Sequence, residues 1–257
     1  MRLGFRVFHA GATVALFFLT AAAFGDAKMS SPVLVELFTS EGCSSCPPAD
    51  AALARLDKEQ TVAGVPVIVL SEHVDYWDGP GWKDPFSSSQ FSARQQAYGA
   101  RFRLESVYTP QMVVDGREQF VGSNAPALRN ALTKAASQNK AELRIVKAAR
   151  NGSEVEVEIE AGHGATGPKG NLNVWVALAR DRESVSIKGG ENSGRNLEHV
   201  AVVRVLVNGG TMKGGGGFHR TVRVPLNPAL KGMRAVVFLQ PSDAGPIAAA
   251  AVRPLED

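Results

Sequence analysis

Cysteine is scarce in this chain, whose 257 residues contain only Cys43 and Cys46. A zinc site of four cysteines is therefore excluded, and half a zinc site would need two further ligands from scattered histidines. The sequence also lacks a phosphate-binding loop, because the glycine-rich segment 209–217 has no Gly-Lys-Ser/Thr ending and no helix after it. We interpret that segment as a connection between strands.

A hydrophobic run long enough to cross a membrane is also absent. The apolar run from Ala10 to Phe24 has 15 residues, short of the roughly 20 that a membrane helix needs. It follows Arg2 and Arg6 and ends in small residues, which is typical of a secretory signal peptide, with an uncleaved anchor as the alternative. We predict that residues 1–25 are removed and that the protein is periplasmic or secreted.

The chain has no marked excess of charge of either sign. Without residues 1–25, 26 basic residues stand against 25 acidic ones, a formal net charge of +1. No basic field remains to argue for a nucleic-acid partner, and no membrane attachment is expected after signal cleavage. Export would place the two cysteines in an oxidising compartment, where they can pair stably.

The two cysteines lie on a predicted turn between a strand and a helix. Val33–Phe38 is an apolar run of strand length, and residues 49, 52, 53 and 56 are apolar at helical spacing. Pro47 suits the first turn of that helix, whose free N–H groups would favour a cysteine thiolate. The setting indicates redox chemistry at Cys43-Ser-Ser-Cys46, with a plain structural disulfide as the alternative.

The rest of the first half alternates helices and strands. Val65–Leu70 predicts a buried strand, Ser87–Phe102 a helix, and Asp115-Gly116 a tight turn between two short strands. Thr109-Pro110 stands directly before that hairpin, and a further helix opens at Ser123–Pro126. A strand, a helix and a strand in this order favour a parallel pair.

This order and its motifs resemble the thioredoxin fold, in which a CxxC opens the first helix and a cis-proline precedes a hairpin. The resemblance covers residues 30–139. The segment Val-Glu-Leu-Phe-Thr-Ser-Glu-Gly-Cys-Ser-Ser-Cys-Pro-Pro-Ala-Asp is also similar to a family of secreted bacterial thioredoxin-like proteins of largely unassigned function.

The thioredoxin resemblance assigns roles to residues around the cysteines. It implies that Cys43 is the attacking and Cys46 the resolving cysteine, and that Pro110 is cis and lies beside them. It also implies that the backbone of Thr109 pairs with an extended substrate. Ser44-Ser45 replace the Gly-Pro of thioredoxins between the cysteines, where they belong to the substrate-binding surface.

Four further side chains are candidates for a supporting role around the dithiol. Glu36 stands close to the position of the buried acid of many thioredoxins. His73, Asp75 and Trp77 follow the second strand, on the sheet edge that is expected to carry the cysteines. This loop would be a lid with His73 as a proton donor or metal ligand; alternatively, tryptophans pack the loop down and His73 or Asp75 caps a turn.

From Ala141 the pattern changes from helical to alternating. Asn151-Gly152 predicts a turn inside a hairpin with one wet face, and about seven strands in all are expected without a convincing helix. This predicts an antiparallel β-sandwich-like domain over residues 140–257. The expected fold class is α+β overall: a thioredoxin-like α/β domain with the CxxC at 30–139, followed by an all-β sandwich-like domain.

Three functions are compatible with these patterns. The first is an exported thiol-disulfide oxidoreductase that needs no cofactor and acts on protein or small-molecule thiols and disulfides. The second is a copper-binding metallochaperone in which Cys43, Cys46 and a histidine hold the ion, since soft thiolates select Cu(I). The third is a non-catalytic binding or scaffold protein with a structural disulfide.

Overall fold

The structure is a computed structural model that describes residue 1 and the ranges 31–62, 64–162, 170–213 and 216–256. The predicted signal peptide therefore lies, apart from Met1, outside the described residues. Three α-helices occur within these ranges: α1 (Pro47–Glu59), α2 (Ser89–Phe102) and α3 (Ala125–Ala136). None of these three helices is both long and apolar enough to cross a membrane.

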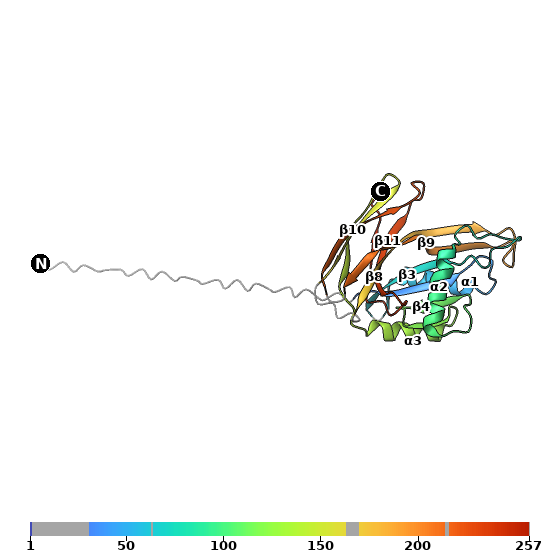
Figure 1. Ribbon diagram of the computed structural model, residues 1–257, viewed down its shortest axis with the longest axis horizontal. Helices are drawn as coiled ribbons and strands as arrows, with labels where there is room; N and C mark the ends of the chain where they lie inside the picture. Colours follow the sequence, from blue (N-terminus) through green and yellow to red (C-terminus); the bar gives the residue numbers. More distant parts are fainter. Residues whose placement is uncertain (2–30, 63, 163–169, 214–215, 257) are drawn as a thin grey trace.

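The strands of the described residues form a large mixed sheet and a small antiparallel one (Figure 1). They are β1 (Val33–Thr39), β2 (Thr61–Val62), β3 (Val65–His73), β4 (Gln111–Val114), β5 (Glu118–Val121), β6 (Leu143–Asn151), β7 (Glu154–Ala161), β8 (Asn171–Ser186), β9 (Asn196–Lys213), β10 (Phe218–Pro225), β11 (Met233–Pro241) and β12 (Ala249–Pro254). The large sheet has nine strands in the order β12-β11-β8-β9-β3-β1-β4-β5, with β2 paired to β3; the small sheet is β10-β7-β6. Residues 209–213 of the glycine-rich segment extend β9 rather than connect strands, and 214–215 are not among the described residues.

The nine-stranded sheet runs through both halves of the chain. Strand β3 pairs in parallel with β9 of the second half, with Ser71 opposite Val202. The expected thioredoxin-like α/β domain followed by a separate all-β sandwich-like domain is therefore wrong, because the fold is mostly β around one mixed sheet. The prediction fails because β9 is a central strand of the sheet. Its residues 200–203 are all buried, as expected for a strand that is covered on both faces. The domain boundary between residues 139 and 140 stays a prediction.

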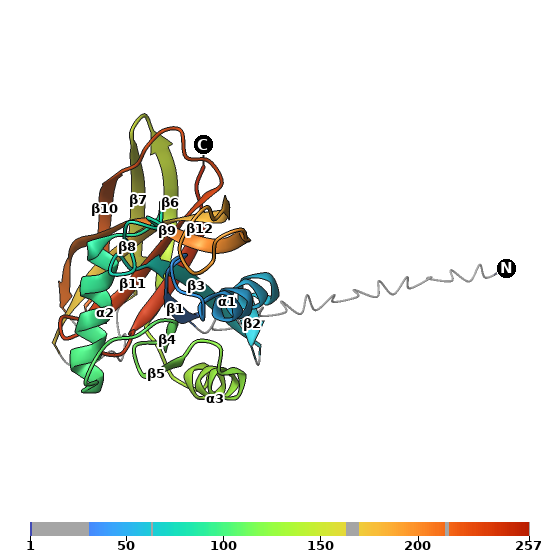
Figure 2. The same cartoon turned by 90° about the vertical axis from the view of Figure 1, so that its right-hand side faces the viewer.

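Helices cover both faces of the part of the sheet that carries the cysteines. Leu53 of α1 and Leu132 of α3 pack with Val35 on one face, whereas Phe91 of α2 packs with Leu34 on the other. Figure 2 shows α2 on one side of the strands and α1 and α3 on the opposite side. The sequence predicts these helices correctly to within a few residues, since their apolar residues recur at helical spacing.

The small sheet packs its apolar face on β8, β11 and β12. The alternation in β7 puts residues 155, 157 and 159 into this core and the glutamates between them toward solvent. The predicted hairpin with one wet face is therefore confirmed for β6 and β7. The small sheet packs on strands of the large sheet that come from the second half of the chain, whereas α1 packs in a separate core cluster. The small sheet is therefore remote from α1 and from the cysteine turn.

Candidate functional site

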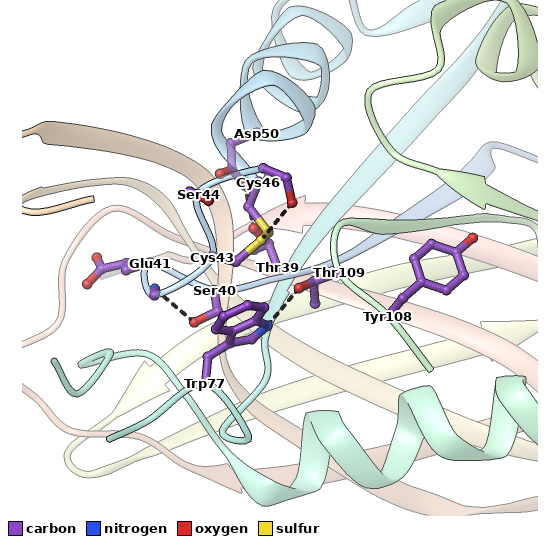
Figure 3. Close-up of a disulfide and its surroundings, with 12 residues drawn as sticks. Thr39, Ser40, Glu41, Cys43, Ser44, Cys46, Asp50, Trp77, Tyr108 and Thr109 are labelled. Atoms are coloured by element: carbon purple, nitrogen blue, oxygen red, sulfur yellow. Dashed lines mark hydrogen bonds between the residues drawn. A yellow bond between two sulfur atoms is a disulfide. The ribbon is translucent and has the colours of Figure 1, made fainter. Parts of the chain in front are cut away.

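The two cysteines lie in the turn between β1 and α1, where they form a disulfide with a Cα–Cα distance of 5.4 Å (Figure 3). Cys46 is the N-cap residue of α1, and Pro47 stands in its first turn. The Cys46 carbonyl accepts from the N–H groups of Ala49 and Asp50 at 2.8 and 3.1 Å. The disulfide is therefore at the positive end of the helix dipole, and both cysteines are fully buried.

The Thr109–Pro110 peptide bond is cis, as the thioredoxin resemblance implies. Gly122 lies between Pro110 and α1: a Cβ placed on it would be 2.9 Å from Cβ of Ala49 and 3.5 Å from Cβ of Pro110. Pro110 is therefore close to the first turn of α1. Trp77 Nε1 donates to Thr109 Oγ1 at 2.8 Å, and Figure 3 shows both side chains next to the disulfide. The structure thus brings the predicted proline segment and Trp77 to the cysteines.

Ser44 and Ser45, the residues between the cysteines, are exposed. Ser45 Oγ lies 3.4 Å from Cys43 Sγ, within hydrogen-bonding reach of sulfur. The N–H of Ser44 donates to Glu191 Oε2 at 3.1 Å. Glu191 belongs to the turn between β8 and β9, so the second half of the chain contacts the CxxC motif directly.

A group of buried acids and imidazoles lies next to the cysteine turn. His73, at the end of β3, bonds Asp84 through Nδ1 at 2.7 Å. His199 of β9 has Nε2 3.6 Å from Glu41 Oε1 and Nδ1 3.9 Å from Asp50 Oδ1. The two imidazole rings meet edge to face with their centroids 4.7 Å apart. We call these five side chains the acid–histidine cluster.

Burial and charge act in opposite directions in the acid–histidine cluster. Burial raises the pKa of the Asp50 carboxyl above its ordinary value of 3.8, although the charge of His199 opposes the rise. For His199, burial alone lowers the pKa, but the neighbouring Glu41, Asp50 and Asp84 outweigh it and hold the pKa above 6.5. Asp50 and His199 therefore hold protons more tightly in the folded protein than in water.

Replacing His199 with glutamine should flatten the pH dependence of stability above pH 6.5. Because the His199 pKa is raised on folding, its stabilisation is complete below the unperturbed value of 6.5 and is lost as the pH rises through the folded value. The free energy of unfolding of the wild type should thus fall with rising pH in this window. Urea unfolding at a series of pH values from about 6 to 9 measures the slope.

The matched control is His219→Gln on β10, a histidine whose side chain is 59% exposed and pairs with Glu158. That substitution should leave the slope above pH 6.5 as it is in the wild type, because an exposed pair is screened by solvent. Equal slopes in the wild type and in His199→Gln would show that His199 takes up no extra proton on folding.

Glu36 lies in a different buried network. Its carboxylate accepts from the Arg94 guanidinium at 2.6 Å and from the Tyr98 hydroxyl at 2.5 Å. Arg94 also lies 3.6 Å from Glu72 and donates to Gln240 of β11 at 3.1 Å. Burial and the Glu36 charge raise the pKa of Glu72 well above 4.5. We call these five residues the Arg94 network; it joins β1, β3, α2 and β11.

The loop after β3 is held by hydrogen bonds to α2 and to the cysteine turn. The Asp75 backbone N–H donates to Ser92 Oγ at 3.1 Å, and the Asp75 carboxylate accepts from the same hydroxyl at 2.5 Å. Trp82 Nε1 donates to Glu41 Oε2 at 2.8 Å. These contacts correspond to the packing interpretation of the loop, while Trp77 stays 38% exposed beside the disulfide.

Sequence reasoning missed most of the acid–histidine cluster, namely Glu41, Asp50, Asp84 and His199. Asp50 could have been found, because it follows Cys46 by four residues in a predicted helix and such residues share a face. Nothing in the sequence indicates that His199 lies near Asp50, since that contact depends on the pairing of β3 with β9.

The copper alternative requires a histidine next to the two cysteines. Among the residues that the structure describes, no group of three or more His, Cys, Asp or Glu side chains is arranged to hold a metal ion. His73, the histidine that the sequence offers as a ligand, uses Nδ1 to bond Asp84.

The fold and the site together define the class of protein: a mixed β-sheet protein with a buried CxxC disulfide at a strand-to-helix turn. Residues 34–240 match the family DUF1223, described as a protein of unknown function, and the chain belongs to this family. It is similar to protein AGR_C_4864 from Agrobacterium tumefaciens, known from an X-ray crystal structure, with 30% identity and a TM-score of 0.67 over 89% of this chain and 96% of that one. HBP35 of Porphyromonas gingivalis has a similar fold, with 17% identity and a TM-score of 0.68 over 88% of this chain and 76% of that one. No curated protein matches the chain.

Proposed function

We propose that this protein is an exported thiol-disulfide oxidoreductase that acts through Cys43 and Cys46 on protein or small-molecule thiols. The carrying observation is the disulfide at the N-terminus of α1 with Thr109–Pro110 and Trp77 beside it. This local arrangement supports a relation to thioredoxin-like enzymes, although the sheet around it differs. A single reactive cysteine pair suits disulfide exchange, which needs no cofactor.

The chemistry is a pair of balanced exchange steps. A substrate thiolate attacks Cys43 Sγ, the Cys43–Cys46 bond breaks, and Cys46 leaves as a thiolate that takes up a proton. A second substrate thiolate then attacks the mixed disulfide, and Cys43 leaves with the electron pair. The substrate ends with one new disulfide and the protein with two thiols; the reverse sequence reduces a substrate disulfide.

The surroundings of the disulfide bear on both reactivity and access. The positive end of α1 stabilises a thiolate, which favours the reduced state of the pair. Both cysteines are fully buried, so a substrate reaches Cys43 only after groups around the disulfide have moved aside. Exchange at this site therefore includes an opening step.

Equilibration with a glutathione redox buffer tests the proposed function. We expect a reduction potential at or above the thioredoxin value of about −270 mV, because a thiolate at a helix N-terminus stabilises the reduced form. The fraction of free thiol is measured by alkylation and the mass of the intact protein. A potential below about −300 mV would identify a structural disulfide and contradict the proposal.

The burial of both cysteines favours a second candidate, a non-catalytic binding protein with a structural disulfide. In that protein the pair resists glutathione and serves only to fix the turn before α1. The same titration separates the two functions, since the structural disulfide stays oxidised across the buffer range in which an exchange site is reduced.

A further inference from the structure

Backbone hydrogen bonds within the turn between β8 and β9 fix its conformation, so the turn can hold a side chain in a defined position. The N–H of Ile187 donates to the carbonyl of Arg195 and the N–H of Gly194 to that of Ile187, each at 2.9 Å. The N–H of Arg195 donates to the carbonyl of Asn192 at 3.1 Å. Gly190 and Gly194 supply the two positive φ angles, 71° and 83°, that the reversal needs.

Asn192 on this turn is fully buried against the cysteine turn. Its Nδ2 donates to the carbonyl of Glu41 at 2.8 Å and to the carbonyl of Cys43 at 3.0 Å. Its Oδ1 accepts from Arg195 Nη1 at 3.2 Å. Both amide hydrogens are thus used, and a flipped amide would place Oδ1 against two carbonyl oxygens.

The Cys43 carbonyl oxygen accepts two hydrogen bonds from different parts of the chain. It accepts from the N–H of Cys46 at 3.2 Å as well as from Asn192, so one oxygen joins the start of α1 to the second half of the chain. On the other side, the N–H of Glu41 donates to Asp84 Oδ2 at 2.9 Å. The backbone just before the disulfide is therefore held from two directions by side chains of other loops.

The position of the turn is itself fixed by close backbone contact. A Cβ placed on Gly189 would lie 1.8 Å from the carbonyl oxygen of Gly81 in the loop after β3, so only glycine fits there. A Cβ on Gly190 would lie 3.3 Å from Cβ of Trp82. These contacts fix the turn against the loop after β3, and the bond from Ser44 to Glu191 links the turn to the CxxC motif.

We propose that Asn192 is a positioning residue for Cys43. Its side-chain amide fixes the backbone that orients the Cys43 sulfur, and the N–H groups of that amide place partial positive charge next to this backbone. This inference rests on the proposed function and extends it, because it makes the reactivity of the N-terminal dithiol depend on the β8–β9 turn. Asn192 acts through the carbonyls of Glu41 and Cys43 and does not touch the substrate.

The experiment compares Asn192→Asp and Asn192→Ala, each in the full chain with Cys46→Ser so that Cys43 is the single thiol. Aspartate has the shape of asparagine but cannot donate, and its charge opposes a nearby thiolate. The rate of Cys43 alkylation by iodoacetamide at pH 7 should fall about three- to tenfold in Asn192→Asp, and the pH midpoint of the rate should rise. Asn192→Ala should slow alkylation with a smaller change in the midpoint.

The control is Asn208→Asp in the same background, the same chemical change near the other end of β9, where Oδ1 accepts from the N–H of Gly210. A rate and midpoint equal to this control in both Asn192 variants would overturn the proposal. If Asn192→Asp does not fold, Asn192→Ala decides on the same readouts, and loss of the fold in both would assign Asn192 to stability instead. Failure of the proposed function is separate, since it appears as a wild-type disulfide that glutathione does not reduce.

Discussion

Substitution of Cys46 by serine should trap a substrate on Cys43, whereas substitution of Cys43 by serine should give much slower trapping on Cys46. Without Cys46, a mixed disulfide on Cys43 has no neighbouring thiol to release it. Incubation with oxidised glutathione should therefore give a lasting glutathione adduct on Cys46→Ser. We expect adduct formation to be at least about tenfold slower on Cys43→Ser, as measured by the mass of the intact protein.

The two cysteine variants also serve as controls for each other. Each removes the same disulfide and should lower the free energy of unfolding by a similar amount, so a difference in adduct formation reports chemistry rather than stability. Equal adduct rates together with equal losses of stability would support the scaffold alternative and refute distinct attacking and resolving roles.

Replacement of Arg94 by leucine should destabilise the protein by about 3–5 kcal/mol, because it leaves the buried Glu36 carboxylate without its cation. The Arg94 side chain is 7% exposed and Glu36 is fully buried, so water cannot take over the interaction. The loss also removes the bond to Gln240 that connects α2 with β11. Urea unfolding of the wild type and the variant gives the difference.

Arg101→Leu is the matched control, since Arg101 lies on the same helix and pairs with Asp243 at the surface, with side chains 30% and 68% exposed. Its loss should cost no more than about 1 kcal/mol. If Arg94→Leu were no less stable than Arg101→Leu, the Arg94 network would not be a source of stability in this fold.

Local structure could be predicted from the sequence wherever one short segment carries the whole signal. The helix after the cysteines begins at Pro47, as its proline and apolar spacing indicate, and β7 shows the alternation of its glutamates. Asp115-Gly116 forms the turn between β4 and β5, with positive φ at both residues. Each of these features depends on neighbours within a few residues.

The joining of the two halves could not be predicted in this way. Residues 200–203 predict a buried strand, but an apolar strand does not reveal which edge it pairs with. The resemblance of the first half to thioredoxin implies a domain of its own over residues 30–139, and in such a domain β3 has no partner strand from the second half. The same pairing brings His199 to Asp50, and for that reason the acid–histidine cluster was missed together with the topology.

The parallel contact of β3 with β9 also bears on how the chain could be divided. A cut near residue 140 would leave β3 and β9 as open edge strands with unpaired N–H and carbonyl groups, which are templates for intermolecular pairing. Helix α1 would lose Val200 and Ala201, on which its apolar face rests. The half that bears the cysteines thus depends on the other half for part of the apolar surface beneath α1. An isolated fragment would be prone to aggregation even with both cysteines in place.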